Sequence, residues 1–93
     1  MSNDSPILWS IDAPEGLERR LNKAILKSYK SKIASMIRSE DPRRYGEWKT
    51  TKYGPAFVIR LNKPVRMAYM VYSDTKIIKL IRVGDHKQVY GKD

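Results

Sequence analysis

The sequence has no cysteine and a single histidine, His86, among its 93 residues. Without thiols the chain can form neither a disulfide framework nor a thiolate zinc site, and one histidine cannot build a histidine-rich metal site. We therefore expect no structural metal and no cofactor. Long apolar runs are also lacking, since nothing approaches the roughly 18 consecutive apolar residues that a membrane-spanning helix needs. No secretory signal pattern is present either, so we expect a cytoplasmic protein without a membrane partner.

Acidic residues are few compared with basic ones. The chain has 19 Lys and Arg against 10 Asp and Glu, which gives a formal net charge of +9. A field of this sign attracts polyanions such as nucleic acid, because Lys and Arg release counterions when they bind phosphates. The alternative is a protein that is basic only for solubility. The short length predicts a single domain over residues 1–93, since two separate cores could not both bury enough apolar surface.

The first half of the chain is predicted to hold a short strand and a helical segment. Residues 7–11 are rich in β-branched and aromatic types, which favour a strand. Asp12 can cap a helix whose first turn holds Pro14, and the helical pattern continues to about Ser39. Its apolar residues recur mostly every four positions, so their stripe would wind around one long straight helix. A break at residues 26–30, which would make a helix hairpin, is therefore the alternative.

The second half is predicted to form a basic loop followed by a sheet. In residues 43–55 cations alternate with aromatic rings, which suits single-stranded RNA, and Lys49 and Lys52 are candidate RNA-binding residues. Alternating apolar residues then predict an antiparallel meander with strands at 56–62, 65–72, 76–83 and 87–90. The fold class is therefore α+β. We expect a helical segment or helix hairpin packed on one face of a small antiparallel sheet, with the other face open.

Two arginines of the meander are predicted to lie side by side. A three-residue turn at 73–75 would pair Arg66 with Arg82 on neighbouring strands. Like charges in this position repel unless an anion lies between them, so the pair suggests a phosphate site. Arg60 would lie beside Arg66 only if the preceding loop has an odd length. We expect that arrangement, because a two-residue loop at 63–64 would bury the Arg60 guanidinium against the helix.

The segment RVGDHKQVY, residues 82–90, brings the only histidine and a tyrosine to the same end of the sheet. His86 belongs to the side-chain type best suited to give or take a proton near neutral pH, although a histidine in a turn can also be an ordinary surface residue. The neighbouring Asp85 could favour the charged form of His86 or weaken RNA binding. Lys87 adds a candidate RNA-binding cation.

The run VRMAYMVYSDTKIIKLIRVGDHKQVYG resembles the C-terminal half of toxins of the RelE/ParE superfamily, which belong to toxin–antitoxin systems. In that family an arginine-led strand precedes a turn, an apolar strand and an ending similar to RVGDHKQVY. The order of strand, helix and meander extends the resemblance loosely over nearly the whole chain. The resemblance implies a RelE-like fold and a cognate antitoxin as partner.

The same resemblance implies one of two activities. RelE- and YoeB-like members are endoribonucleases that cleave mRNA on the ribosome without a metal, by attack of a 2′-hydroxyl on the adjacent phosphate. ParE-like members are non-catalytic gyrase inhibitors. By resemblance to the first branch, Arg66 would stabilise charge, His86 would supply the leaving-group proton, and Tyr90 would stack on or orient the substrate. Glu47 resembles, in rough position, the glutamate base of YoeB-like members, and its alternative is a surface carboxylate.

The chain departs from the RelE pattern at one position. RelE-type members carry two basic residues on the strand before the arginine, where this chain has Val58 and Arg60. One strand cation is therefore missing. This leaves open a third alternative, a nucleic-acid-binding relative that kept the fold and lost the chemistry.

Overall fold

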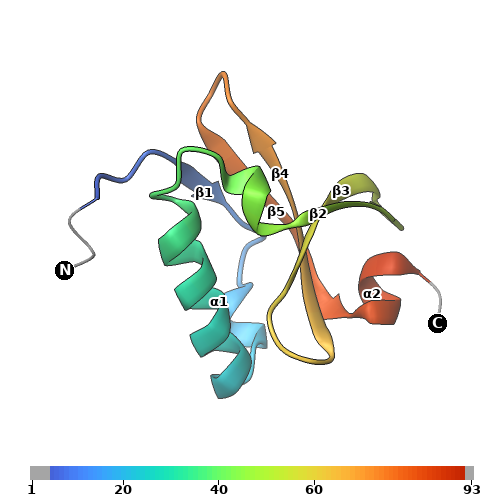
Figure 1. Ribbon diagram of the computed structural model, residues 1–93. Helices are drawn as coiled ribbons and strands as arrows, with labels where there is room; N and C mark the ends of the chain where they lie inside the picture. The colour runs from blue at the N-terminus through green and yellow to red at the C-terminus, as the bar shows by residue number, and fades with distance from the viewer. Residues whose placement is uncertain (1–4, 92–93) are drawn as a thin grey trace.

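The computed structural model describes residues 5–91 and is built on a five-stranded sheet with the strand order β1-β5-β4-β3-β2 (Figure 1). The strands are β1 (Ser10–Asp12), β2 (Glu47–Thr51), β3 (Gly54–Arg60), β4 (Val65–Tyr72) and β5 (Ile77–Asp85). The helices are α1 (Lys23–Met36) and α2 (His86–Tyr90), with 3-10 turns η2 (Glu18–Arg20) and η3 (Pro42–Tyr45). The predicted α+β class is confirmed. The sheet is antiparallel except at one edge, where β1 runs parallel to β5.

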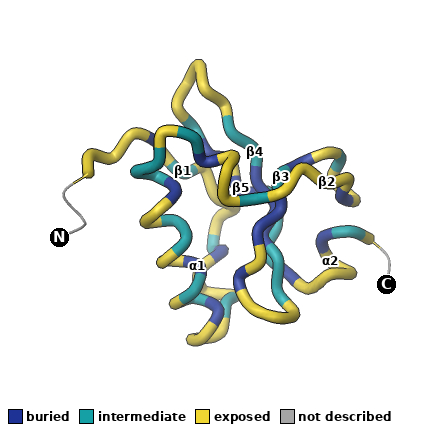
Figure 2. The backbone as a smooth tube through the Cα atoms, in the orientation of Figure 1, coloured by how far each residue is buried: buried dark blue, intermediate teal, exposed yellow. Residues whose placement is uncertain are grey.

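The long helix α1 packs on one face of the sheet, as predicted (Figure 1). Phe57, Ile59 and Leu61 belong to the core on this face, whereas Val58 belongs to a second cluster on the other face, which confirms the predicted alternation along β3. Figure 2 shows buried residues concentrated in the central strands. The fully or nearly buried members of the main core include Ile25, Tyr29, Met36, Met67, Tyr69, Ile78 and Leu80. Each large aliphatic side chain buried there stabilises the fold by about 1.5–3 kcal/mol.

The helix begins later than predicted. Asp12 is the last residue of β1 rather than a helix cap, and the chain then makes only the short turn η2 before Leu21 becomes extended. Asn22 is the actual N-cap of α1, because its side chain accepts a hydrogen bond from the Ile25 N–H at 2.9 Å. The capping signal at Asn22 was present in the sequence but was hidden inside the longer apolar pattern.

From Lys23 to Met36, α1 is continuous, so the alternative with a break at residues 26–30 does not hold, and the helix ends before Ser39. A break would be needed only in one long helix, whereas α1 has only 14 residues. Its apolar stripe therefore stays on one side. Within residues 5–91, no helix has the length and apolar character needed to cross a membrane.

The stretch at residues 43–55, predicted as a loop, instead forms most of η3, the edge strand β2 and the start of β3. A two-residue turn at Lys52 and Tyr53 joins the two strands. The Thr51 hydroxyl stabilises this turn by donating to the Gly54 carbonyl at 2.7 Å and accepting from the Tyr53 N–H at 3.0 Å. Every residue of β2 except Thr51 is exposed, so β2 shows no apolar alternation that could have predicted a strand.

The register between β4 and β5 differs from the prediction. The turn comprises four residues, 73–76, and a bulge beside Ala68 shifts the register once more. Arg66 consequently lies opposite Gly84, and Arg82 lies opposite Ala68. The predicted pairing of Arg66 with Arg82 is therefore wrong.

The segment predicted as a last strand, 87–90, belongs to the helix α2. Asp85 and Gln88 form a capping box: the Asp85 carboxylate accepts from the Gln88 N–H at 2.8 Å, and the Gln88 side chain accepts from the Asp85 N–H at 2.9 Å. Val89 packs on the sheet face opposite α1, against Ala56, Val58 and Ala68. The expectation of an open face is thus wrong where α2 covers it, and helices of very different length lie on the two faces (Figure 1).

Candidate nucleic-acid interface

Arg60 and Arg66 are direct cross-strand neighbours at the ends of β3 and β4. This confirms the expectation that an odd-length loop places them side by side on the face away from α1. The Arg66 guanidinium also holds the loop between the strands, since its Nη1 donates to the carbonyls of Asn62 at 3.2 Å and Lys63 at 2.9 Å. Two guanidinium groups in such positions repel each other, and an anion between them removes the repulsion.

A pocket of about 660 Å³ opens beside this arginine pair. Glu47 from β2 lines it together with both arginines, so the structure brings three of the sequence-predicted site residues together. Three further residues line it that were not predicted individually as site residues: Lys32, Arg44 and Tyr45. Its charged lining residues are four cations, Lys32, Arg44, Arg60 and Arg66, and one carboxylate, Glu47, so the pocket favours an anionic ligand.

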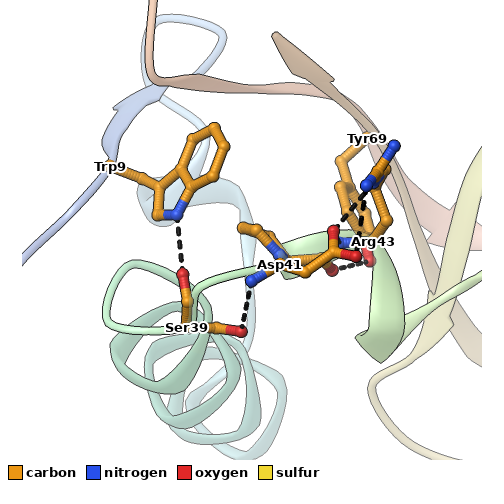
Figure 3. A network of polar contacts seen from close by, with 6 residues as sticks. Trp9, Ser39, Asp41, Arg43 and Tyr69 are labelled. Carbon is orange, nitrogen blue, oxygen red and sulfur yellow. Dashed lines mark hydrogen bonds and ion pairs between the residues drawn. The ribbon is translucent and has the colours of Figure 1, made fainter. Parts of the chain in front are cut away.

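Tyr69 fixes the turn η3, which carries Arg44 and Tyr45 to the pocket. Its buried hydroxyl donates to the Pro42 carbonyl at 2.8 Å (Figure 3). Burial raises the pKa of Tyr69 above the ordinary tyrosine value, so the hydroxyl keeps its proton, and its role as donor, further into alkaline solution than an exposed tyrosine does. Gly46 permits this approach, because a Cβ there would lie 2.8 Å from the Tyr69 hydroxyl and 3.1 Å from a backbone carbonyl.

A second set of polar contacts holds η3 from the side of α1 (Figure 3). The Asp41 carboxylate accepts from Arg43 Nε at 2.7 Å and from Arg43 Nη2 at 3.2 Å, and this hydrogen bonding lowers the pKa of Asp41. The Asp41 N–H donates to the Ser39 hydroxyl, and the Trp9 indole donates to the Ser39 carbonyl at 2.7 Å. The exposed ion pair between Asp41 and Arg43 contributes little to stability alone. The hydrogen bond from the buried Trp9 connects this segment to the chain just before β1.

Glu47 lies on a strand and not in the loop that the sequence analysis expected. It pairs with Val58 across β2 and β3, and its carboxylate lies 3.3 Å from the Lys49 ammonium. Both side chains are largely exposed, so this ion pair leaves the carboxylate accessible. The strand β2 thus holds the backbone of Glu47 beside the arginine pair, while its side chain is exposed to solvent.

His86, Lys87 and Tyr90 lie on α2, and the rings of His86 and Tyr90 are in contact, with centroids 4.4 Å apart. Tyr90 packs against the cluster under α2, which includes Val58, and Val58 also lines the pocket of the arginine pair. The His86–Tyr90 pair therefore lies on the same sheet face as Arg60, and neither ring lines the pocket. Lys87 is exposed on the same helix.

Two of the predicted RNA-binding cations lie elsewhere. Arg82 lines a different pocket, and Lys52 sits in the β2–β3 turn, where its N–H donates to the Val89 carbonyl at 3.0 Å. Asp85 caps α2 through Gln88, and its expected influence on His86 stays a prediction. Among residues 5–91, no three His, Cys, Asp or Glu side chains gather as a metal-binding group would need.

The fold is similar to that of solved toxin structures, although no family model and no curated protein matches the sequence. A chain of the toxin–antitoxin complex RelBE2 from Mycobacterium tuberculosis matches with a TM-score of 0.61 and 17% identity, over 86% of this chain and 100% of that chain. A chain of the archaeal RelE–RelB complex from Pyrococcus horikoshii matches with a TM-score of 0.64 and 16% identity, over 85% and 96%. A mutant of the E. coli toxin RelE in the free state matches with a TM-score of 0.65 and 19% identity, over 88% and 87%.

Proposed function

Because the chain has a RelE-like fold, we propose that it acts as a toxin-like endoribonuclease that cleaves mRNA on the ribosome. The observation that carries the proposal is the pairing of Arg60 with Arg66 in a cationic pocket that also contains Glu47. The RelE-like fold alone does not distinguish an active enzyme from a binding relative, whereas this set of side chains matches the needs of phosphodiester cleavage. Action on ribosomes requires a cytoplasmic protein.

The proposed reaction needs a base, an acid and charge stabilisation, and it involves no metal or cofactor. Glu47 would take the proton of the 2′-hydroxyl, and the freed oxygen would attack the adjacent phosphorus. Arg60 and Arg66 would stabilise the additional negative charge of the five-coordinate phosphorane. The bond from phosphorus to the 5′-oxygen then breaks, and His86 would protonate that oxygen. The products are a 2′,3′-cyclic phosphate and a 5′-hydroxyl end.

Other side chains on the same face would bind the substrate rather than react with it. The Tyr90 ring, held against His86, would stack on or orient a nucleotide near the scissile bond. Lys49 and Lys87 are exposed and would contact phosphates. Lys32, Arg44 and Tyr45 join them in this proposal because they line the pocket of the arginine pair.

A protein antitoxin is the second proposed partner. Two of the similar structures are toxin–antitoxin complexes, RelBE2 and the archaeal RelE–RelB complex. A net charge of +9 suits an acidic partner, because opposite potentials steer association and neutralise the repulsion among the cations. We therefore propose a cognate antitoxin that covers the basic face.

Incubation with translating ribosomes tests the enzymatic proposal. The wild-type protein should generate new mRNA 5′ ends that carry a hydroxyl. His86→Ala should slow cleavage by about 100- to 10,000-fold through loss of the acid. Lys30→Ala, a change at an exposed cation of α1 outside the pocket, serves as control and should leave cleavage unchanged.

If the wild-type protein does not cleave mRNA but inhibits DNA supercoiling by gyrase, the proposal is wrong and the function is ParE-like. Intact mRNA, intact supercoiling and salt-dependent RNA binding together would identify a relative that lacks catalysis. Each outcome has its own readout, so the three alternatives are separable.

A further inference from the structure

A second pocket, of about 530 Å³, lies along β5 where that strand extends beyond its neighbour β1. β1 pairs only with Ile77–Lys79, and the pocket lies beside the residues that follow. Four separate segments contribute polar or aromatic side chains: Arg20 from η2, Tyr53 from the β2–β3 turn, Arg82 from β5 and Gln88 from α2. This pocket and the pocket of the arginine pair have no lining residue in common.

Arg82 lines this pocket and has an unsatisfied buried donor. Its Nε is buried and has no hydrogen-bond partner within residues 5–91. A guanidinium N–H that has lost its water and gained no acceptor destabilises the protein, and buried polar groups without partners are rare in folded proteins. The small side chain of Ala68, opposite Arg82, offers no acceptor. A ligand that draws the guanidinium toward the pocket and supplies an acceptor would satisfy the donor.

The remaining polar groups of the pocket are also mostly donors. No Asp or Glu is among its lining residues. The Arg20 guanidinium makes a long hydrogen bond of 3.4 Å to the Glu15 carbonyl, and Gln88 uses its side-chain oxygen in the cap of α2, which leaves its NH₂ group as a donor. Two guanidinium groups and an amide donor suit an oxyanion, because the planar fork of arginine matches the oxygens of phosphate.

Tyr53 gives the pocket a surface on which a base can stack. Its side chain is 45% exposed although it lines the pocket, and the Lys52 ammonium lies 5.7 Å from the ring centroid. Aromatic rings beside cations are the usual platform for single-stranded nucleic acid, since every base has a face that can stack.

We propose that this second pocket is a nucleotide subsite for single-stranded RNA, in which Arg82 and Arg20 bind a phosphate and Tyr53 stacks on the attached base. The subsite rests on the proposed function, because its ligand is the RNA substrate outside the scissile bond. It extends that function by giving the protein a second, fixed contact with the RNA chain.

Binding of a 2′-O-methyl RNA oligonucleotide, which cannot be cleaved by 2′-hydroxyl attack, tests the subsite by fluorescence anisotropy. Arg82→Ala and Tyr53→Ala should each raise the dissociation constant about tenfold, whereas Tyr53→Phe should bind like the wild type, since stacking on an aromatic ring is worth roughly 1–3 kcal/mol per base. Lys30→Ala and Tyr72→Ala are the matched controls for a cation and an exposed ring outside the pocket. Arg82→Lys keeps the charge but loses the fork, and it should bind more weakly than the wild type.

Inorganic phosphate alone identifies the source of the recognised group. If phosphate raises the melting temperature of the wild type but not of Arg82→Ala, the site binds a free phosphate as well as RNA. If only the oligonucleotide distinguishes the two proteins, the site is specific for the RNA chain. If Arg82→Ala and Tyr53→Ala lose no more affinity for the oligonucleotide than their controls do, the proposed subsite is wrong.

Failure of the subsite and failure of the proposed function give different results. If the wild type cleaves mRNA while Arg82→Ala and Tyr53→Ala bind the oligonucleotide like their controls, the subsite is wrong and the proposed enzymatic function stands. If oligonucleotide binding depends on Arg82 and Tyr53 but the wild type does not cleave mRNA, the subsite stands and the proposed enzymatic function is wrong.

Discussion

Arg60 and Arg66 lie directly opposite each other on β3 and β4, next to a pocket that Lys32 and Arg44 also line. Side chains of opposed residues in an antiparallel pair start only about 4.5–5.5 Å apart, so two positive charges there destabilise each other. Arg66 is restrained by the carbonyls of Asn62 and Lys63 and cannot simply turn away without losing these contacts. The cationic side chains of the pocket are therefore already positioned to bind an anion.

Arg66→Ala and Arg60→Ala should each reduce mRNA cleavage by about 100-fold, because each removes a preorganised donor to the phosphorane. Their free energy of unfolding should stay within about 1 kcal/mol of the wild type, since lost contacts are offset by relief of the repulsion. Cleavage rates on ribosomes and urea titrations measure the two effects. Lys63→Ala, in the adjoining loop, is the control, and equal activity of the Arg66 and Lys63 variants would remove the pair from the mechanism.

Substitutions at Asp85 separate two roles for this carboxylate. Asp85→Ala should lower the free energy of unfolding by about 1 kcal/mol and reduce cleavage, because it removes the cap of the helix that carries His86. Asp85→Asn should keep both stability and activity, since Asn is an equally good cap without the charge. If the negative charge itself acted on His86, the Asn variant would lose activity as the Ala variant does while remaining stable.

The sequence predicts the central part of this fold because its pattern is strong there. β3 and β4 are runs of mostly apolar, β-branched and aromatic residues that adjoin Arg60 and Arg66, so both strands could be predicted. The pairing of the two arginines followed from the cost of burying the Arg60 guanidinium against the helix. β2 could not be recognised because it is an exposed edge strand, held by its hydrogen bonds to β3 rather than by an apolar face. For α2, the apolar Val89 and aromatic Tyr90 favoured a strand, whereas the capping box and the cluster around Val89 select a helix.

The site is less predictable than the fold, since it depends on where separate elements meet. Lys32 reaches the pocket only because α1 packs beside the end of β3, and no local pattern encodes that contact. The cross-strand partner of Arg82 was predicted wrongly, because β5 contains a bulge and the turn before it has one additional residue. Together they change the partner from Arg66 to Ala68. Arg44 and Tyr45 did carry a signal, because they lie in the basic and aromatic stretch that was selected for RNA binding.

Glu47→Gln should reduce cleavage by about 100- to 10,000-fold if Glu47 is the base, because the amide cannot accept the proton of the 2′-hydroxyl. Its binding of the uncleavable oligonucleotide should not weaken, since the substitution removes a negative charge from a cationic pocket. Lys49→Ala breaks the same exposed ion pair but keeps the carboxylate, so it should lose far less cleavage than Glu47→Gln. A Glu47→Gln protein that cleaves as fast as the wild type would identify Glu47 as an ordinary surface carboxylate.

Tyr69→Phe should destabilise the protein by about 1–3 kcal/mol, because it leaves the buried Pro42 carbonyl without its donor. Cleavage should also fall, since η3 carries Arg44 and Tyr45 into the pocket. Urea titration and cleavage rates measure both effects. Tyr72→Phe removes the hydroxyl of a tyrosine that is 42% exposed, and this control should match the wild type. Wild-type stability in Tyr69→Phe would show that the hydrogen bond to Pro42 contributes nothing.

The pH dependence of stability should report the same hydroxyl independently. Burial raises the pKa of Tyr69 above the ordinary tyrosine value of 10.0, so in alkaline solution the unfolded chain loses this proton before the folded one. The contribution of Tyr69 to the free energy of unfolding is therefore complete below the ordinary tyrosine pKa of 10.0 and decreases as the pH rises above it. Burial also raises the pKa of Tyr29, which adds to the same decrease in both proteins. Urea titrations from neutral pH to about pH 11 should show a shallower alkaline loss of stability in Tyr69→Phe than in the wild type, because one of the two titrating groups is gone. Parallel curves for the two proteins would contradict the raised pKa and the buried donor role that it implies.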